Sequence, residues 1–188
     1  YFEKFNKDKN SKNWRDWPYL TGDGATQSAD GYFRILGRLD DVINVAGHRL
    51  GTKELESAAL TVEEISEAAA VPAYDELKGR VPELFVSLKP GYEATDEVEE
   101  RVKSATARII GPIARPTHVW VTSDLPKTRS GKIMRRVIAA ISNFLDVGDT
   151  TTLSNPEVVE EIRRQVQTAK VESGQVPKGV PKEVIEEI

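Results

Sequence analysis

The densest positive charge of the chain lies in one short segment, Pro126 to Arg136. Five cations and no anion fall between Lys127 and Arg136, whereas the whole chain has a formal net charge of −4. Ser130 is a preferred N-cap residue, so we expect a helix to begin there and to carry Lys132 in its first turn. A cation is unfavourable at that end of the helix dipole, whereas an anion is attracted to it. A lysine in this place therefore indicates a site for a phosphate or carboxylate; the alternative is a solvated basic face.

Polar residues beside glycines form weaker candidates. Asp23 lies between two glycines after a short predicted strand, where its carboxylate could accept hydrogen bonds from two hydroxyls of a ribose. The alternative is an ordinary Asp-Gly turn. The segments 37–41 and 47–49 could similarly be a charged turn and a plain loop, and His48 has no identifiable partner that would make it a general base.

Composition excludes several kinds of site. The chain has 188 residues, of which 39% are hydrophobic, so we expect one compact core with extensions. Its pI near 5.4 argues against a nucleic-acid partner. With no cysteine and only two histidines we expect no metal site, and no run of about 18 apolar residues marks a membrane partner. We therefore expect a cytoplasmic protein, and its first residue, Tyr1, suggests that the chain was cut from something longer.

Turn residues and alternating apolar residues predict β-structure in the first part of the chain. It should span residues 19–36, beginning with a short strand, with a turn at 22–25 and a hairpin turn at Asp30-Gly31. A second apolar run, 42–45, should end in a loop at 46–51, where paired glycines indicate special backbone geometry.

The rest of the chain shows helical and strand patterns that do not alternate strictly, which favours the α+β class. Thr52 should cap a helix whose first turns carry Glu54 and Glu56. The remaining elements are strands at 68–72, 84–88 and 119–121, helices at 95–109, 130–145 and 156–170, and a linker at 176–181. The spacing of apolar residues places Ile109 and Leu145 on the buried faces of their helices.

In this order, three segments resemble the late motifs of the adenylate-forming synthetases, and of acetyl- and propionyl-CoA synthetases in particular. They are TGDGA at 21–25, DGYFRILGRLDDVINVAGHRLG at 30–51 and LPKTRSGKIMRR at 125–136. The resemblance covers about residues 19–166. It implies an α+β fold: a small C-terminal domain with a few-stranded sheet flanked by helices, preceded by a β-hairpin from the end of a large N-terminal domain.

The resemblance implies a role for each matching side chain. Lys132 would be the catalytic residue that bridges the carboxylate and the α-phosphate during adenylation. Asp23 would bind the ribose hydroxyls of ATP and of the acyl-adenylate, and Arg38 would assist at the ribose and phosphates. Arg49 would contact the phosphates of ATP. The family holds the CoA nucleotide with a basic residue ahead of a Gly-Pro pair, and Arg108 is the nearest such residue here.

The resemblance also implies a division of the chain into parts that move. Asp40 would be the hinge, and the backbone of Gly47 would line the tunnel for the pantetheine of CoA once the domain has rotated. Residues 1–39 would then be a remnant of the N-terminal domain, 40–148 the mobile C-terminal domain, and 149–188 a helical, linker-like tail.

The implied enzyme is an AMP-forming ligase with ATP, AMP and CoA as ligands and Mg²⁺ in its intact form. It would join a short-chain carboxylic acid to CoA, with the rest of its own N-terminal domain as partner. The lysine matching Lys132 resembles a regulatory acetylation site, which implies a lysine acetyltransferase and a deacetylase as further partners. The acyl pocket would lie upstream, so we expect the fragment alone to be inactive.

Three alternatives remain at this stage. The chain could be a non-catalytic regulatory or interaction module with the same fold, and the presence of both Asp23 and Lys132 speaks against this. It could be part of a multifunctional acyl-CoA synthase, with the tail leading to a further domain. It could also be a basic anion-binding domain without an enzymatic parent, in which case salt would weaken its binding to polyanions and CoA would have no effect.

Overall fold

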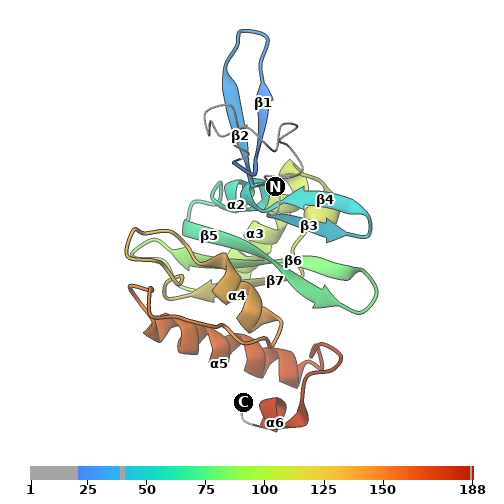
Figure 1. Cartoon of the computed structure of the whole chain (residues 1–188), viewed down its shortest axis with the longest axis vertical. Coiled ribbons are helices and arrows are strands. Elements are labelled where there is room, and N and C mark those ends of the chain that lie inside the picture. The colour runs from blue at the N-terminus through green and yellow to red at the C-terminus, as the bar shows by residue number, and fades with distance from the viewer. Residues whose placement is uncertain (1–20, 39–40, 187) are drawn as a thin grey trace, which may run out of the picture. The chain divides into compact units, whose positions relative to one another are not determined.

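The computed structural model of the chain describes residues 21–38, 41–186 and 188 (Figure 1). The chain divides into two compact units, Tyr1–Asp41 and Val42–Ile188. The α+β class is confirmed, since helices and strands are both present and the strands of the larger unit form two antiparallel pairs and one parallel pair.

The first unit contains a β-hairpin made of β1 (Asp23–Gln27) and β2 (Phe33–Arg38), which pair antiparallel. The predicted hairpin turn at Asp30-Gly31 is confirmed, because the amide of Ser28 donates to the carbonyl of Tyr32 at 2.9 Å and so closes the turn. The turn predicted at 22–25 is wrong, since β1 already begins at Asp23. Of the strand predicted at 19–21, Thr21 is not in a strand and the other two residues lie outside the described residues.

A three-stranded sheet forms the centre of the second unit. It contains β5 (Ile65–Asp75), β6 (Gly79–Leu88) and β7 (His118–Thr122), in the order β5-β6-β7. The strands predicted at 68–72, 84–88 and 119–121 lie within these three; β5 pairs antiparallel to β6, and β7 pairs parallel to β6. The continuous buried run 68–71 shows that both faces of the sheet are covered, because successive side chains of a strand point to opposite faces.

One face of the sheet is covered by α2 (Thr52–Ala59), α3 (Asp96–Ile109) and the hairpin of β3 (Val42–Val45) and β4 (His48–Gly51). Thr95 caps α3 by accepting a hydrogen bond from the amide of Val98, so the predicted start of this helix is confirmed. The expected burial of Ile109 is wrong, since its side chain is half exposed.

The predicted cap of α2 is also wrong. Gly51 is the N-cap residue, and the Thr52 side chain is buried with no hydrogen-bond partner for its hydroxyl among the described residues. Thr52 lies on the side of α2 that packs against the core, and its side chain is therefore buried. It does not bond to the free amides of the first turn, as a cap residue would.

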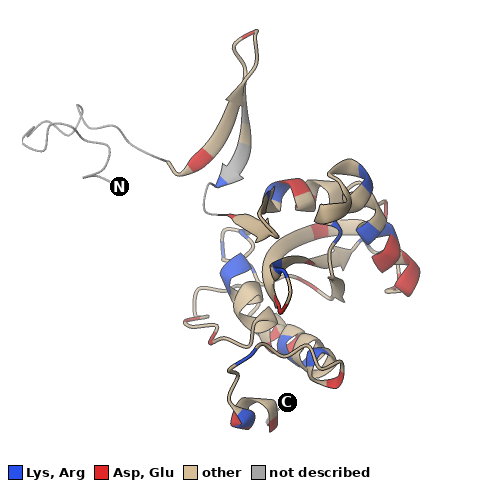
Figure 2. Ribbon diagram, turned by 90° about the vertical axis from the view of Figure 1, so that its right-hand side faces the viewer, with Lys and Arg blue, Asp and Glu red and all other residues tan. Residues whose placement is uncertain are grey.

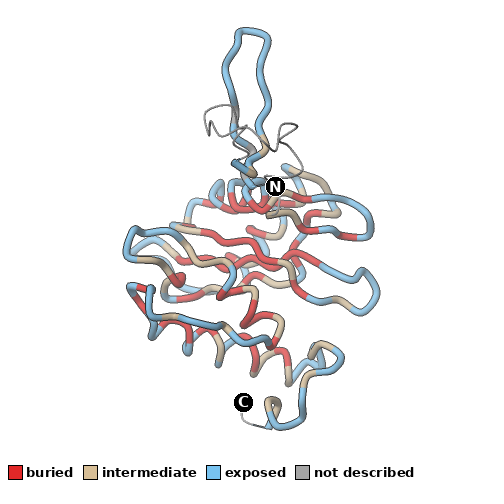
Figure 3. Tube along the Cα trace, in the orientation of Figure 1, coloured by how far each residue is buried: buried red, intermediate tan, exposed pale blue. Residues whose placement is uncertain are grey.

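The other face is covered by α4 (Arg135–Ser142) and α5 (Glu157–Glu172). Buried side chains of both helices join one apolar cluster with Phe85 of β6, and Figure 3 shows the buried residues along the strands and on the helix sides that face them. The helix predicted at 156–170 is thus part of the core. Leu145, expected on the buried face, is 64% exposed because α4 ends before it. Past α5 the described residues contain one short helix, α6 (Lys182–Glu186), which has no buried residue.

A buried ion pair ties α5 to the sheet. Nζ of Lys170 lies 2.8 Å from Oε1 of Glu83, and both side chains are nearly inaccessible. Ser142 and Trp120 donate hydrogen bonds to the other carboxylate oxygen, so every polar group of the pair has a partner. Burial lowers the pKa of Lys170, and the attraction of Glu83 offsets only part of that effect.

We expect Lys170→Met to destabilise the chain by about 3–5 kcal/mol, because it leaves the Glu83 carboxylate buried without a counter-charge. Adding Glu83→Gln to that variant should restore part of the stability, since the amide is neutral and its oxygen can still accept from Ser142 and Trp120. Urea unfolding followed by circular dichroism measures both. Equal stability of the single and double variants would show that the pair is not the reason for the loss.

Candidate functional site

Lys132 lies in a tight loop, and not in the first turn of a helix as predicted. The loop spans residues 127–133 and is called the lysine loop below. A β-bridge between Lys127 and Ile133 closes it, and the Thr128 amide donates to the carbonyl of Lys132 at 2.9 Å. Ser130 does not cap α4; its hydroxyl lies 3.0 Å from that of Thr128. Lys132 therefore does not lie in the first turn at the positive end of a helix dipole.

Lys127, at the start of the loop, has a structural role. Its Nζ lies 2.6 Å from Oε2 of Glu67 and 2.7 Å from Oδ1 of Asp124. Burial alone would lower the pKa of Lys127, but the two carboxylates outweigh it and raise that pKa. Burial would likewise raise the pKa of Asp124, but hydrogen bonds from Lys127 and from the Leu125 amide lower it. Each group thus keeps the other charged, and the pair fixes one end of the loop.

Two arginines fix the other end. Nη2 of Arg135 lies 2.7 Å from Oε2 of Glu56, whose other oxygen accepts from the Ala70 amide at 3.1 Å. Glu56 is buried and so links α2, β5 and α4, a role that sequence reasoning missed when it placed this residue at the helix dipole. A signal was present, because the spacing 52, 55, 56, 59 puts Glu56 on the apolar face of its helix. Arg136 donates to the carbonyl of Asp149 at 3.0 Å.

The two remaining cations of the basic segment point to solvent. Arg129 and Lys132 are exposed, and their charged groups have no hydrogen bond or ion pair within the part of the chain that the structure describes. In Figure 2 the first turn of α4, which begins with two arginines, is blue. Lys132 is therefore a cation on a fixed backbone with its charge available to an anionic ligand.

The hairpin of β3 and β4 carries Gly47 and Arg49. Ala46 and Gly47 have φ values of 46° and 88°, as the tight two-residue turn between these strands requires. Special backbone geometry at Gly47 is thus confirmed, but the rest of the predicted loop is strand β4, and Gly51 has an ordinary φ of −74°. Arg49 lies on β4 opposite Asn44, with its side chain exposed.

Asp23 and Arg38 are direct cross-strand partners at the open end of the β1–β2 hairpin. Gly22 has a φ of +78°, and a Cβ there would lie 3.3 Å from Nη2 of Arg38. Glycine thus lets the guanidinium approach the backbone beside Asp23. The structure brings together two residues that sequence reasoning assigned to the same nucleotide. Asp40, the predicted hinge, lies outside the described residues.

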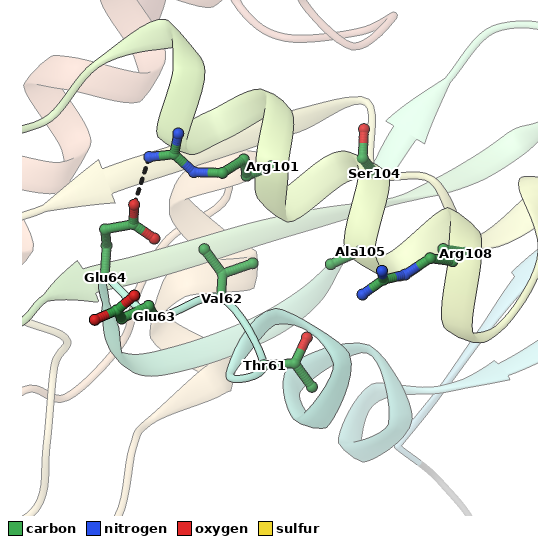
Figure 4. A pocket seen from close by; sticks show the side chains of 8 residues that line it. All are labelled: Thr61, Val62, Glu63, Glu64, Arg101, Ser104, Ala105 and Arg108. Carbon is green, nitrogen blue, oxygen red and sulfur yellow. Dashed lines mark hydrogen bonds and ion pairs between the residues drawn. The ribbon is translucent and has the colours of Figure 1, made fainter.

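An open pocket of about 500 Å³ lies between α3 and the segment that follows α2 (Figure 4). Its lining residues are Thr61, Val62, Glu63, Glu64, Arg101, Ser104, Ala105 and Arg108. Arg101 is paired with Glu64 at 2.5 Å, whereas the exposed Arg108 side chain reaches toward the segment that holds Thr61. Arg108 is therefore the basic group available for a ligand in this pocket.

Within the second unit, the lysine loop and the β3–β4 turn lie at opposite sides in Figure 1. The described residues contain no cluster of three or more His, Cys, Asp or Glu side chains suited to a metal ion. Among the same residues, no helix has the length and apolar character needed to cross a membrane.

The chain is similar in sequence to a known domain family and to known enzymes. Residues 54–132 match the family model described as AMP-binding enzyme C-terminal domain. The chain is 46% identical over 153 residues to an acetyl-coenzyme A synthetase of Rubrobacter xylanophilus, which covers 81% of this chain but only 24% of that protein. The chain thus spans about a quarter of the length of the curated relatives it matches.

Solved structures show the same relationship. An anthranilate CoA ligase in complex with anthranoyl-AMP superposes with a TM-score of 0.60 and 28% identity, over 65% of this chain and 24% of that one. An ATP-bound chimera named RpMatB-BxBclM gives a TM-score of 0.61 at 26% identity, over 66% and 24%. From the family match, the acetyl-CoA synthetase relatives and these superpositions, we conclude that this chain carries an AMP-binding enzyme C-terminal domain.

Proposed function

We propose that this chain supplies the mobile C-terminal domain of an AMP-forming ligase of the acetyl- or propionyl-CoA synthetase type. The enzyme converts a short-chain carboxylic acid and ATP to acyl-adenylate and pyrophosphate, and then converts acyl-adenylate and CoA to acyl-CoA and AMP. The observation that carries the proposal is Lys132: an exposed cation with no partner in the described structure, on a loop whose two ends are held by ion pairs. The domain serves this reaction together with the rest of the enzyme and is inactive alone.

Adenylation needs a positive charge where negative charge builds up. The substrate carboxylate attacks the α-phosphorus of ATP, and the phosphoryl oxygens gain charge in the transition state before pyrophosphate leaves. The ammonium of Lys132 donates hydrogen bonds to both the carboxylate and the α-phosphate, which lowers their mutual repulsion and stabilises that state. Because the loop backbone is fixed before the substrates bind, little reorganisation is needed at that moment.

The first unit carries two residues that we assign to the nucleotide. Asp23 accepts hydrogen bonds from the ribose hydroxyls, and Arg38 beside it contacts the ribose and phosphates; their cross-strand pairing supports a shared ligand. The described residues offer no carboxylate or imidazole cluster for Mg²⁺. We assign Mg²⁺ to the phosphates of ATP.

The thioester step uses a different surface of the domain. The backbone at Gly47 lines the path of the pantetheine, and Arg108 in its open pocket binds the CoA nucleotide. Arg49, expected at the phosphates of ATP, lies on the same hairpin as Gly47, so we give it no part in the adenylation step. The β3–β4 turn and the lysine loop lie at opposite sides of the unit, so a single orientation cannot bring both to one reaction centre. Rotation about Asp40 accounts for both steps, and the division of the chain between Asp41 and Val42 supports a hinge there.

The first hairpin fits the end of a larger domain. Its Tyr32, Phe33 and Ile35 side chains are 76%, 68% and 65% exposed, which is unusual for large apolar groups on a two-stranded hairpin. We assign these side chains to packing against the rest of the N-terminal domain.

The exposed ammonium of Lys132 also makes it a target for a lysine acetyltransferase, and a deacetylase would restore its charge.

In the complete enzyme we expect Lys132→Ala to slow acyl-adenylate formation by about two to three orders of magnitude, as for the loss of one key electrostatic donor. The thioester half-reaction, started from preformed acyl-adenylate and CoA, should continue near the wild-type rate. Acid-dependent pyrophosphate exchange measures the first step, and release of acyl-CoA measures the second.

Arg129→Ala is the matched control for this prediction, since it removes the other exposed cation of the same loop that lacks a partner in the described structure. It should change adenylation by less than about tenfold, because an exposed charge beside the site acts only through screened electrostatics. If Lys132→Ala slows both half-reactions equally, or neither, the lysine is merely solvated or structural and the proposed mechanism fails.

Asp40→Pro should slow the thioester half-reaction much more than adenylation, because proline restricts the φ angle that a hinge must change. The two half-reactions are measured as for Lys132, with a hydrogen-exchange comparison to verify that the domains remain folded. Equal slowing of both steps would count against Asp40 as the hinge.

A further inference from the structure

The segment after α4 returns to the lysine loop and lies against it. Thr128 and Leu153 form a β-bridge, and the amide of Ser154 donates to the carbonyl of Lys127 at 2.8 Å. Leu153 is only 5% exposed, so the bridge is anchored in the core. This segment lies outside the part of the chain that matches the family model, which ends at residue 132.

Asn155 makes the most extensive contacts of this segment. Its Oδ1 accepts from the Lys127 amide at 3.0 Å. Its Nδ2 donates to Oδ2 of Asp124 at 2.8 Å and to the carbonyl of Leu125 at 2.9 Å. The remaining oxygen of Asp124 accepts from Nζ of Lys127, so the amide of Asn155 completes a closed ring of hydrogen bonds. Because only 9% of the surface of Asn155 is exposed, water competes little for these hydrogen bonds.

We propose that Asn155 is a positioning residue for Lys132. Asn155 holds the backbone at Lys127 through the amide of that residue. The amide of the next residue, Thr128, donates to the carbonyl of Lys132, and the amide of Gly131 donates to the carbonyl of Thr128 at 2.8 Å. The position of Lys132 is thus transmitted from Asn155 through the loop backbone. Asn155 itself touches no reacting atom. The kinetic consequence rests on the proposed role of Lys132, whereas the effect on the loop does not.

The chain provides a matched control in Asn143. Its Nδ2 donates to the carbonyls of Pro72 and Ala139 at 2.8 and 2.7 Å, and its Oδ1 accepts from the Tyr74 amide at 2.9 Å. Like Asn155, it accepts one hydrogen bond from a backbone amide and donates two, although both of its donated bonds go to carbonyls whereas Asn155 donates one to a carboxylate. It lies at the other end of α4, without contact to the lysine loop. Asn143→Ala and Asn155→Ala should lose similar global stability and differ only in what happens to the loop.

Limited trypsin digestion of this chain tests the loop directly, because Arg129 and Lys132 are exposed cleavage sites within it. We expect Asn155→Ala to raise the rate of cleavage after these two residues by about tenfold, since local opening becomes easier. Asn143→Ala should leave that rate within about twofold once global unfolding, measured in urea, is taken into account. Equal rates for the two variants would overturn the proposal. If Asn155→Ala does not fold, Asn155→Ser, which keeps a small polar group there, takes its place in the same comparison.

The complete synthetase tests the catalytic consequence. Asn155→Ala should lower kcat for pyrophosphate exchange by about 10- to 100-fold, as for a displaced catalytic group, with the KM for ATP and the thioester half-reaction little changed. Asn143→Ala should alter none of these. A loss shared by both half-reactions, or by both variants, would mean that Asn155 acts only on stability. If Lys132→Ala leaves adenylation unchanged while Asn155→Ala still exposes the loop to trypsin, the proposed function fails and the positioning of the loop remains.

Discussion

The three-stranded sheet of the second unit is buried on both faces, and the positions of the functional loops follow from this constraint. Alternate residues of β5 and β6 contribute to two separate apolar clusters, one with α2 and α3 and the other with α4 and α5. Since neither layer can be removed without exposing apolar strand residues, the connections that leave the sheet are held at fixed points. The lysine loop is one of these connections, between β7 and α4.

Charge is used in two different ways in this domain. Basic residues at the two ends of the lysine loop form ion pairs within the domain. Lys127 pairs with Glu67 and Asp124, and Arg135 pairs with Glu56. These pairs are partly or largely shielded from solvent, where loss of one partner would leave a costly uncompensated charge. Because these carboxylates already have cationic partners, they do not pair with Lys132. The ammonium of Lys132 has no such partner among the described residues, although the chain as a whole is acidic.

The layered arrangement also separates the two surfaces that we assign to the two half-reactions. The β3–β4 hairpin packs with the α2 and α3 layer, whereas the lysine loop is held by α4 and by the segment leading into α5. A rigid body that presents different sides to one reaction centre needs a pivot more than internal flexibility. The extensive bracing of the loop fits that requirement, because a catalytic charge carried on a moving domain must arrive already in position.

The sequence by itself determined the elements whose signals are local. The cap and period of α3, the Asp-Gly turn, the apolar strand runs and the order of the three motifs are each contained within a few consecutive residues. The start of α4 could not be predicted, because Ser130 is a good local cap residue. In the structure the bridge between Lys127 and Ile133 and the hydrogen bonds of Lys127 with Ser154 and Asn155 hold this segment as a loop instead. Lys127 and Asn155 are 28 positions apart in the sequence, and Glu56 and Arg135 are 79 positions apart. Only the tertiary structure decided these partners, since a contact between distant segments leaves no periodicity in either one.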